Sequence, residues 1–393
     1  MRQTQISVGF IPLVDAAPLV VAHEMGFAAE EGIALDLRRA PSWSSIRDML
    51  SFGQVDAAHM LAPMPVATAL GLGGGMTPVV AGSVLSVNGT VIGVNTQIAA
   101  RLRSAGHNFA FDDAYSAGAA LIAATPDGLR IGVPFPFSMQ RALVEYWLGT
   151  IGHAVREKVT IHTVPPPLMV DAIEAGEIDA FCVGEPWGSM AVEKGVATLL
   201  LPGAAIWKFA PEKILAVRST WAETESVLLG RLIRAVWRAG RWLAEPASQS
   251  LAAELLSRQR YLDLSPEIIE RALTGRLVIS SRGEERQVPQ FLEFFDGVAT
   301  FPWRSQGEWI GRHLAQQHQL DVTASATAGG AVFRTDLYRA ALGRTSAILP
   351  VESSKPEGGM PEVSSVPGMT GHVSLKPDTF FDGTVFEPIQ DNR

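Results

Sequence analysis

The stretch GQVDA at residues 53–57 returns as GEIDA at residues 176–180, and a proline follows each copy at the same distance, as Pro63 and Pro186. The same offset relates two further pairs, which are VGF at residues 8–10 with IGV at residues 131–133, and Gly26 with Gly149. A shared offset across several landmarks indicates two α/β lobes with the same pattern. Two such lobes facing each other form a cleft, and clefts of this kind commonly bind small ligands.

Short apolar runs alternate with segments of helical spacing in both copies of the repeat. Strands are expected at residues 6–10, 33–37, 57–61, 130–133, 159–163 and 180–183. Helices are expected at residues 17–25, 44–52, 138–148 and 168–175, and others begin at Pro63 and Pro186. Proline suits the first turn of a helix, where its missing N–H has no intrahelical partner. This alternation predicts mainly parallel sheets with helices on both faces.

Two strand-like segments should connect the lobes. Runs at residues 77–83 and 89–94 place the first crossover near residues 87–90, and the return crossover is expected at residues 214–218. Helices after the return are expected at residues 222–244, 247–257, 266–273, 288–295, 309–317 and 335–342. The predicted division is lobe one at residues 1–87, lobe two at 88–213, a helical return to lobe one at 214–346, and an extended tail at 347–393 that docks on the body.

Composition excludes several classes of protein. Of the 393 residues 47% are hydrophobic and 18% are charged, which excludes wholesale disorder. The formal net charge is −8 and no run of five basic residues occurs, so direct binding to nucleic acid is not expected. The single cysteine, Cys182, lies in an apolar run and is expected to be a buried small hydrophobe rather than a reactive thiol.

The amino-terminal segment lacks the pattern of a secretory signal. Met1 is followed almost directly by the first expected strand, and the apolar segment after it is interrupted by Pro12, Asp15 and Pro18. No apolar span is long enough for a transmembrane helix, so no membrane insertion is expected. The expectation is a cytoplasmic protein, and the alternative is an exported protein whose export sequence is absent from this chain.

The repeat also predicts where a ligand would bind. In open α/β sheets, ligands lie beyond the carboxyl ends of the strands and against helix N-termini. The turns at these positions are residues 11–13, 41–45, 61–63, 135–140 and 184–187. Free N–H groups and the helix dipole at such turns favour an anion.

Lys213 and Trp43 are the leading candidates for side chains in the cleft. Lys213 lies beside the expected return crossover, where it would be a cationic partner for an anion; the alternative is a lysine that faces solvent. Trp43 lies in a predicted turn and would either cap the core or form an apolar wall with an N–H donor.

Four other polar residues have a structural interpretation beside a functional one. Ser138 and Gln140 fall on the first turn of a predicted helix, where helix capping explains Ser138 by itself. His59 lies on a predicted buried strand and is more readily a core histidine than a ligand. Glu185 would be a catalytic carboxylate, a calcium ligand, or a structural carboxylate stabilised by a helix dipole.

Motifs that carry catalysis are missing. HExxH, CxxC, GxSxG and P-loop patterns do not occur, and the glycine-rich residues 71–75 lack the lysine of a nucleotide loop. The sequence therefore predicts no enzyme, no metal and no cofactor. An enzyme on the same bilobal fold stays open as a third hypothesis, and turnover of a bound ligand would support it.

Several segments of the chain resemble the nitrate/bicarbonate-binding proteins of the NrtA/CmpA family. They are SWSSIRD at residues 42–48, DAAHMLAPMP at 56–65, EYWL at 145–148, PPPLMV at 165–170, FCVGEPW at 181–187, PEK at 211–213 and FFDG at 380–383. The resemblance spans nearly the whole chain. It implies a type II periplasmic-binding-protein fold, with two α/β lobes that close on a small oxyanion.

The resemblance also implies five ligand-binding positions. Trp43, Gly184 and Lys213 match the tryptophan, the turn glycine and the lysine of the family. Thr90 falls where the family has a polar residue on the first hinge strand, and Gln140 falls where it has a histidine, so these two depart from the pattern. Bicarbonate binders of the family resemble this chain less, because they carry a carboxylate and calcium in place of the lysine. Lys213 therefore favours nitrate or nitrite.

Within the family, the expected lack of an export signal makes this chain similar to the cytoplasmic branch of NasS-type nitrate/nitrite sensors. That similarity implies a sensor that regulates nitrate assimilation by sequestering an RNA-binding antiterminator of the NasT type until the anion binds. The alternative is the substrate-binding component of a nitrate/nitrite ABC transporter.

Overall fold

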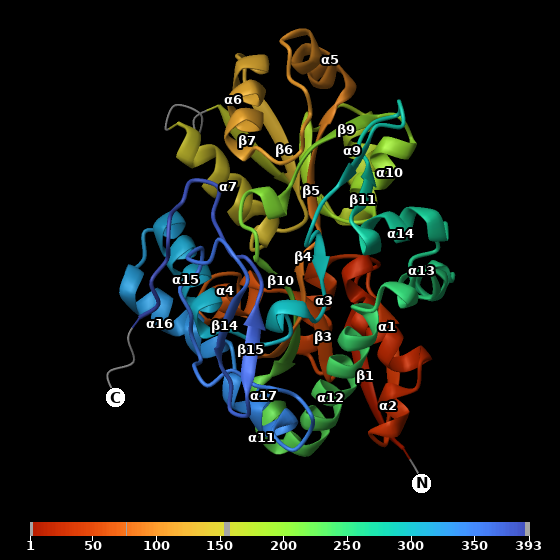
Figure 1. The fold of residues 1–393 in the computed structure, drawn as a ribbon, viewed down its shortest axis with the longest axis vertical. Helices are drawn as coiled ribbons and strands as arrows, with labels where there is room; N and C mark the ends of the chain where they lie inside the picture. Colours follow the sequence, from red (N-terminus) through yellow and green to blue (C-terminus); the bar gives the residue numbers. More distant parts are fainter. Residues whose placement is uncertain (1–2, 76, 153–157, 390–393) are drawn as a thin grey trace.

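Two separate β-sheets form the frame of the protein (Figure 1). The computed structural model describes residues 3–75, 77–152 and 158–389. The first sheet has six strands, in the order β13 (Leu292–Glu293), β4 (Val79–Asn88), β10 (Pro211–Arg218), β3 (Ala57–Leu61), β1 (Thr4–Phe10) and β2 (Ile33–Arg39). The second has five, in the order β7 (Val159–Thr163), β6 (Leu129–Val133), β8 (Ala180–Gly184), β5 (Thr90–Asn95) and β9 (Ala197–Pro202). We call the parts built on these sheets lobe one and lobe two.

The repeat in the sequence is also a repeat of backbone pairing. In lobe one Val8 pairs with Ala57 across β1 and β3, and at the same offset Ile131 pairs with Ala180 across β6 and β8. In both lobes the same hydrogen bond fixes the start of this pairing, because an aspartate carboxylate accepts a bond from the backbone N–H of the first strand. The distances are 2.9 Å for Ser7 and Asp56 in lobe one, and 3.0 Å for Arg130 and Asp179 in lobe two.

One landmark of the repeat does not correspond in structure. Gly26 is the left-handed residue, with φ 80°, that precedes the short helix α2 (Phe27–Glu30). Gly149 instead lies inside the helix α7 (Met139–Ile151). The shared offset at this pair therefore reflects no common turn.

The first crossover between lobes agrees with the sequence, and the return lies earlier than expected. β4 ends at Asn88 and β5 begins at Thr90, and Gly89 between them has a φ of 90° that favours glycine. The return runs from the end of β9 to the start of β10, so the expected crossover at residues 214–218 is wrong. Those residues are paired with β3 and β4 inside the sheet of lobe one, and so is Lys213.

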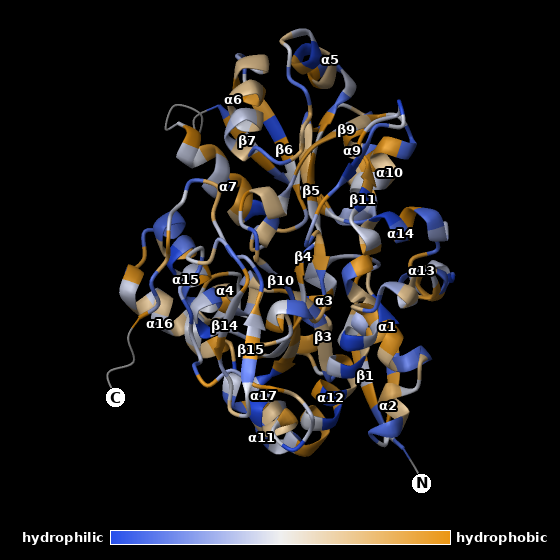
Figure 2. Ribbon diagram, in the orientation of Figure 1, coloured by the Kyte–Doolittle hydropathy of each residue, from blue (hydrophilic) through white to orange (hydrophobic). Residues whose placement is uncertain are grey.

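Helices cover both sheets, and Figure 2 shows apolar residues concentrated on the strands that they cover. In the first part of lobe one they are α1 (Ala17–Glu24), α3 (Trp43–Ser51) and α4 (Pro63–Ala69). Lobe two carries α5 (Thr96–Ser104), α6 (Ala114–Ala124), α7, α9 (Met169–Glu174) and α10 (Trp187–Glu193). The part after β10 contains α11 (Ser219–Thr224), α12 (Ser226–Leu243), α13 (Gln249–Ser257), α14 (Pro266–Thr274), α15 (Arg304–His318), α16 (Val322–Val332) and α17 (Thr335–Leu342).

The prediction of a helix at residues 288–295 is wrong. This segment contains a turn at residues 289–290 and a short strand, because Leu292 and Glu293 form the edge strand β13 beside β4. It follows the small hairpin of β11 (Arg276–Val278) and β12 (Glu285–Gln287). The apolar residues that suggested a helix pack into the core instead, since Val288 and Phe291 are buried.

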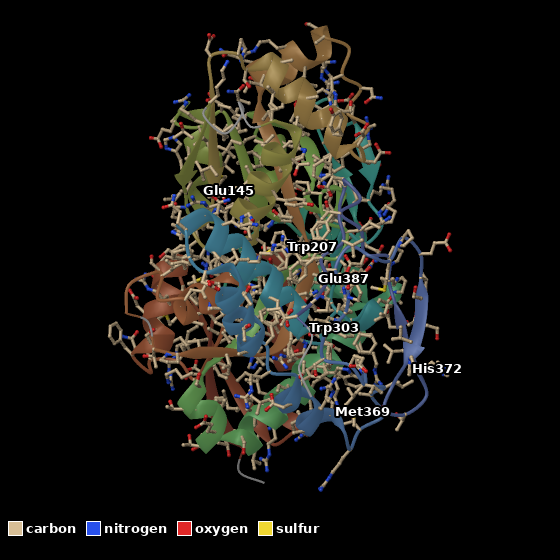
Figure 3. The ribbon with its side chains drawn as sticks, turned by 90° about the vertical axis from the view of Figure 1, so that its left-hand side faces the viewer. Glu145, Trp207, Trp303, Met369, His372 and Glu387 are labelled. Atoms are coloured by element: carbon tan, nitrogen blue, oxygen red, sulfur yellow. The ribbon has the colours of Figure 1, made fainter. Side chains whose placement is uncertain are left out.

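The tail after α17 lies against the body and contacts both lobes (Figure 1). It includes the hairpin β14 (Ser364–Pro367) and β15 (His372–Leu375). Beyond the hairpin, Asp378 accepts a 2.8 Å hydrogen bond from the indole of Trp207, and the Tyr146 hydroxyl of α7 lies 2.9 Å from the Asp382 carboxylate. Figure 3 shows Trp207 deep in the molecule, and Met369 and His372 on the outer hairpin. Among the described residues, no helix is both long enough and apolar enough to cross a membrane.

Candidate functional site

The five candidate residues lie where the two lobes meet, with Thr90 at the first crossover and paired with Gly184. Trp43 opens α3, and its helix is capped by Ser42, whose hydroxyl accepts from the backbone N–H of Ser45. Gln140 lies in the first turn of α7, which Ser138 caps in the same way. Gly184 ends β8, and Lys213 lies on β10. The capping expected of Ser138 is confirmed.

Lys213 is the centre of a buried group of polar side chains. Its Nζ lies 2.8 Å from Asp15 Oδ2 and 2.5 Å from Glu212 Oε1. The amide of Gln140 donates a 2.5 Å hydrogen bond to the same oxygen of Glu212. Lys213 and Glu212 are 0% exposed, and Asp15 and Gln140 are at most 2% exposed. With His59 and Trp43 these residues form what we call the cleft cluster.

The remaining two members close one side of the cleft cluster. His59 Nε2 lies 2.8 Å from Asp15 Oδ1, and the His59 and Trp43 rings are 5.6 Å apart. Lys213 Nζ is 5.6 Å from the centre of the Trp43 ring, within the range of a cation–π contact. Among the described residues, the buried Trp43 Nε1 has no hydrogen-bond partner. His59 is therefore buried as the sequence suggested, but it belongs to the site as well.

The pKa values of the titratable groups in the cleft cluster are set by neighbouring charges in one pair of residues and by burial in another. Burial alone would raise the pKa of Asp15, but Lys213 and His59 outweigh it and hold that pKa below its usual value. Burial works against the charged form of Lys213 too, yet its two carboxylate neighbours keep the lysine pKa above its usual value. A charged Asp15–Lys213 pair results.

Glu212 and His59 behave differently, because burial dominates for both. Burial raises the pKa of Glu212 in spite of the attraction of Lys213. Burial also lowers the pKa of His59, and the nearby Lys213 lowers it further, in spite of Asp15. His59 is therefore neutral at pH 7, and Glu212 is the carboxyl group in the cleft cluster that most readily takes up a proton.

Thr90 and Gly184 contribute to the site less directly. The Thr90 hydroxyl donates a 2.9 Å hydrogen bond to the backbone oxygen of Val183 and lies 3.6 Å from Cys182 Sγ. Gly184 faces the site, since a Cβ there would lie 3.6 Å from Asp15 Oδ2. Cys182 is buried as expected, and burial raises the pKa of its thiol to about 12.

The Glu185 carboxylate is bonded to the first turn of α10, as its structural interpretation predicts. Its Oε2 accepts a 3.1 Å hydrogen bond from the backbone N–H of Ser189 in α10, and burial raises its pKa to about 7. Its backbone oxygen accepts a 2.9 Å bond from the N–H of Val14, and Trp187 Nε1 donates a 3.1 Å bond to the oxygen of Pro12. The 184–187 turn therefore ties lobe two to the 11–13 turn of lobe one, as the repeat predicted for facing turns.

A second contact between lobes lies beside the cleft, between α7 and α15. Glu145 Oε2 is 3.2 Å from His313 Nε2, and the other oxygen of Glu145 accepts a 2.8 Å bond from Arg141. Figure 3 shows Glu145 at the level where the two lobes meet. We call the pair Glu145–His313 the lobe latch, because it joins a helix of lobe two to a helix of lobe one.

Sequence reasoning missed two members of the cleft cluster, Asp15 and Glu212. The signal for Asp15 was a carboxylate inside an otherwise apolar segment, two residues after the predicted site turn at residues 11–13. Glu212 offered no such signal, because neighbouring residues of a regular strand point to opposite faces. Register shifts on both sides of Lys213 disturb this alternation in β10, and the side chains of Glu212 and Lys213 meet at 2.5 Å.

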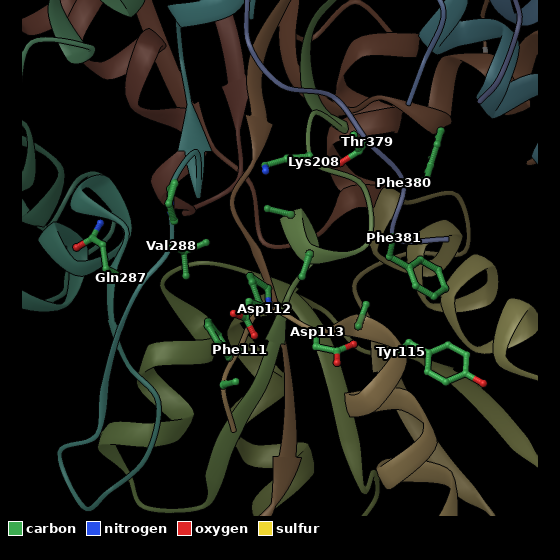
Figure 4. A pocket seen from close by; sticks show the side chains of 16 residues that line it. Phe111, Asp112, Asp113, Tyr115, Lys208, Gln287, Val288, Thr379, Phe380 and Phe381 are labelled. Carbon is green, nitrogen blue, oxygen red and sulfur yellow. The ribbon is translucent and has the colours of Figure 1, made fainter. Parts of the chain in front are cut away.

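A large cavity lies away from the cleft cluster. It has a volume of about 760 Å³ and is lined by the loop before α6, the segment after β9, the residues before β13 and the tail (Figure 4). Lys208, Asp112 and Phe381 are among its side chains. As for metals, the described residues contain no group of three or more histidine, cysteine, aspartate or glutamate side chains able to hold an ion.

Comparison with known proteins identifies relatives over most of the chain. The profile of the NMT1-like family matches residues 1–257. "Nitrate import ATP-binding protein NrtC" of Synechocystis sp. is 32% identical over 82% of this chain and 47% of its own length. "Nitrate/nitrite binding protein NrtA" of Nostoc sp. is 28% identical over 99% of this chain and 84% of its own length. The chain thus spans about half of the first relative and most of the second.

A solved structure supports the same conclusion about the fold. The periplasmic nitrate-binding protein NrtA from Synechocystis PCC 6803 is 26% identical, with a TM-score of 0.83 over 98% of this chain and 96% of that one. The resemblance to NrtA/CmpA proteins and the periplasmic-binding-protein fold are therefore confirmed.

Proposed function

The chain belongs to the NMT1-like family, and from this premise we propose that it binds nitrate or nitrite in the cleft between its lobes. The two NrtA relatives are named as nitrate-binding proteins, which favours a binding protein over an enzyme. The proposed site is the cleft cluster, with the five residues Trp43, Thr90, Gln140, Gly184 and Lys213 around the anion.

One observation carries this proposal. Two N–H donors of different chemistry, the Lys213 ammonium and the Gln140 amide, meet at one buried point from different lobes, and the Trp43 ring beside Lys213 carries an indole N–H without a partner among the described residues. A small planar oxyanion accepts from several donors at once, and charge-assisted bonds to it are strong in a buried site. Because Gln140 belongs to lobe two and the others to lobe one, a bound anion would hold the lobes together.

Binding would act by shifting the balance between open and closed lobes. An anion that touches both lobes has more contacts in the closed form, and only such a difference in affinity shifts the equilibrium. The lobe latch and the bond from Trp187 to Pro12 are contacts between the lobes that an opening of the cleft would break. We therefore infer that anion binding and these contacts stabilise each other.

Calorimetric titration tests the ligand and the site together. Nitrate, nitrite and bicarbonate, each with and without calcium, are titrated into the wild type and into Lys213→Ala. We expect nitrate or nitrite to bind the wild type, and Lys213→Ala to bind at least about 100-fold more weakly, because a buried charge-assisted contact is lost. Lys208→Ala, a lysine that lines the separate cavity, is the matched control and should bind like the wild type.

Two results would contradict the proposal. If the folded wild type binds neither nitrate nor nitrite, the proposed ligand is wrong. If nitrate binds tightly and Lys213→Ala binds it equally well, the anion lies elsewhere and the assignment of the cleft cluster is wrong. Conversion of the ligand during titration would revive the enzyme hypothesis.

The cellular role that anion binding serves is a separate proposal. From the sequence we propose a cytoplasmic sensor that sequesters an RNA-binding antiterminator until the anion binds. The names of the relatives, which include a nitrate import protein, favour the second candidate, a binding component of a nitrate/nitrite ABC transporter.

The two outputs differ in the protein that the chain meets. Co-purification from native cells, with and without nitrate, separates them. The sensor predicts an antiterminator that is released by nitrate. The transporter component predicts association with membrane subunits and a native protein found outside the cytoplasm.

A further inference from the structure

Glu212 engages the donors that the proposed anion would need. Its Oε1 lies 2.5 Å from Gln140 Nε2 and 2.5 Å from Lys213 Nζ. Gln140 belongs to α7 of lobe two and Lys213 to β10 of lobe one, so this carboxylate oxygen bridges the lobes. A carboxylate is planar and carries its charge on oxygen atoms, which makes it similar to nitrate as a hydrogen-bond acceptor.

We propose that the Glu212 carboxyl group is an internal competitor of the anion, which binds only after Glu212 has released Gln140 and Lys213. This inference rests on the proposed function and names a residue that sets affinity at the same site. In this role the Glu212 carboxylate forms, between Gln140 and Lys213, the bridge that a bound anion would otherwise form.

The charges around Glu212 explain why the two acceptors exclude each other. The groups that face it are Lys213 on its own strand, Asp15 before α1, Gln140 on α7 and Cys182 on β8, and His59 on β3 lies behind Asp15. Only Lys213 is positive, and Asp15 already compensates its charge. With Glu212 ionised the group is net negative, and a second anion would be repelled in a site with little water to screen it.

Protonation of Glu212 removes this conflict. A neutral carboxyl group no longer competes for the ammonium of Lys213, and its O–H is itself a donor for an anion. Its Oε2, which is buried and has no partner among the described residues, is the oxygen able to take the proton. Burial raises the pKa of Glu212, whereas Lys213 and His59 hold that of Asp15 down, so the proton goes to Glu212. Anion binding should therefore take up a proton.

The test is calorimetric titration with nitrate between pH 6 and pH 8, in two buffers with different heats of ionisation. The variants are Glu212→Gln and, as the matched control, Glu293→Gln. Glu293 has a pKa that burial raises to about 7, but it lies on β13, outside the cleft cluster. Thermal unfolding of each variant confirms that it is folded.

For the wild type we expect affinity to fall by up to about tenfold for each unit of rising pH, with uptake of close to one proton on binding. Glu212→Gln should bind more tightly than the wild type at pH 8, with little dependence on pH. Glu293→Gln should behave like the wild type.

Two outcomes overturn the inference and leave the proposed function intact. One is nitrate binding by the wild type with no pH dependence and no proton uptake. The other is a folded Glu212→Gln that binds nitrate more weakly than the wild type at every pH, which would make Glu212 a helper of the anion. If neither the wild type nor Glu212→Gln binds nitrate or nitrite at any pH, the proposed function itself fails.

Discussion

At the scale of single residues, Trp43 is the side chain at which the contribution of ring shape can be separated most clearly from that of the N–H hydrogen bond. Its ring lies beside Lys213 and His59, and its Nε1 has no partner among the described residues. The substitution Trp43→Phe keeps most of the aromatic surface and removes the N–H. We expect nitrate affinity to fall by about tenfold, since a hydrogen bond to a charged group contributes about 1.5–3 kcal/mol.

Thermal unfolding and nitrate titration of Trp43→Phe check this prediction together. A melting temperature close to that of the wild type with weaker binding supports a direct role for the indole N–H. Unchanged nitrate affinity would show that Trp43 serves only as an apolar wall.

Glu185 predicts a pH dependence of stability. Its folded pKa of about 7 lies above the usual value of 4.5, because the group is buried. The folded state therefore holds the proton more strongly, and stability from this group is lost as the pH rises from about 4.5 to about 7. The variant Glu185→Gln keeps an acceptor for the N–H of Ser189 and cannot titrate. The wild type should lose unfolding free energy on the order of 3 kcal/mol over this pH window, and the variant should not.

Urea unfolding of the wild type and Glu185→Gln at pH 5 and pH 7.5 measures this difference. The variant should gain stability relative to the wild type at the higher pH. If the two proteins differ by the same amount at both values, Glu185 does not titrate in this window.

At this scale, the sequence identified the residues that stand at turns and missed one that depends on strand irregularity. Trp43, Gln140 and Gly184 follow from the repeat, because the carboxyl ends of parallel strands meet at one edge. Lys213 was expected in the cleft from its place near the return. Glu212 could not be predicted, because a bulge in β10 overrides the alternation of side chains that strand sequences normally show.

At the scale of elements, α15 and α16 pack through glycines. A Cβ on Gly307 would lie 2.3 Å from the backbone oxygen of Gly329, and a Cβ on Gly329 would lie 2.2 Å from the oxygen of Gly307. Side chains at these positions would force the helices apart. We expect Gly307→Ala to lower the free energy of unfolding by about 1–3 kcal/mol, in spite of the better helix propensity of alanine.

Gly230→Ala in α12 is the matched control, because the nearest atoms to its new Cβ lie 3.5 Å or more away. This variant should be as stable as the wild type or more stable by up to about 1 kcal/mol. Equal effects of the two substitutions in urea unfolding would contradict close packing of α15 on α16.

The same glycines explain why the sequence did not predict α16. Its residues are mostly Gly, Ala and Thr, without the apolar stripe by which a surface helix is recognised. The error at residues 288–295 has the opposite cause. Apolar residues at helical spacing occur there, but the segment follows a hairpin and completes the sheet edge beside β4. Tertiary pairing decided the structure of this short apolar run.

At the scale of the whole molecule, the lobe latch should favour the closed form. Glu145 and His313 come from different lobes, and both side chains are largely buried. We expect His313→Ala to weaken nitrate binding by about twofold to tenfold, because opening becomes easier while the cleft cluster is untouched. Small-angle scattering without nitrate should show a larger radius of gyration for this variant.

His372→Ala, on the exposed hairpin of the tail, is the control for the latch and should match the wild type (Figure 3). Weaker binding by His313→Ala without a change in the radius of gyration would contradict a role in closure. Unchanged binding and unchanged dimensions would show that the latch contributes nothing.

The whole-molecule architecture was the most predictable level. The repeat predicted two lobes, and the structure gives them the same strand pairing and the same aspartate bond to the first strand. The position of the return crossover was not predictable, because the segment after β9 carries little regular structure before it rejoins lobe one. The path of the tail depends on specific contacts such as that of Asp378 with Trp207, which no local pattern reveals.

The buried Cys182 has a practical consequence. Because the chain has no other cysteine and this thiol is enclosed, thiol-reactive dyes should leave the native protein almost unlabelled. A cysteine introduced on an exposed rim of the cleft would then be the one attachment point for an environment-sensitive fluorophore. If the proposed anion moves the lobes, such a fluorophore would report its binding as a change of colour or brightness.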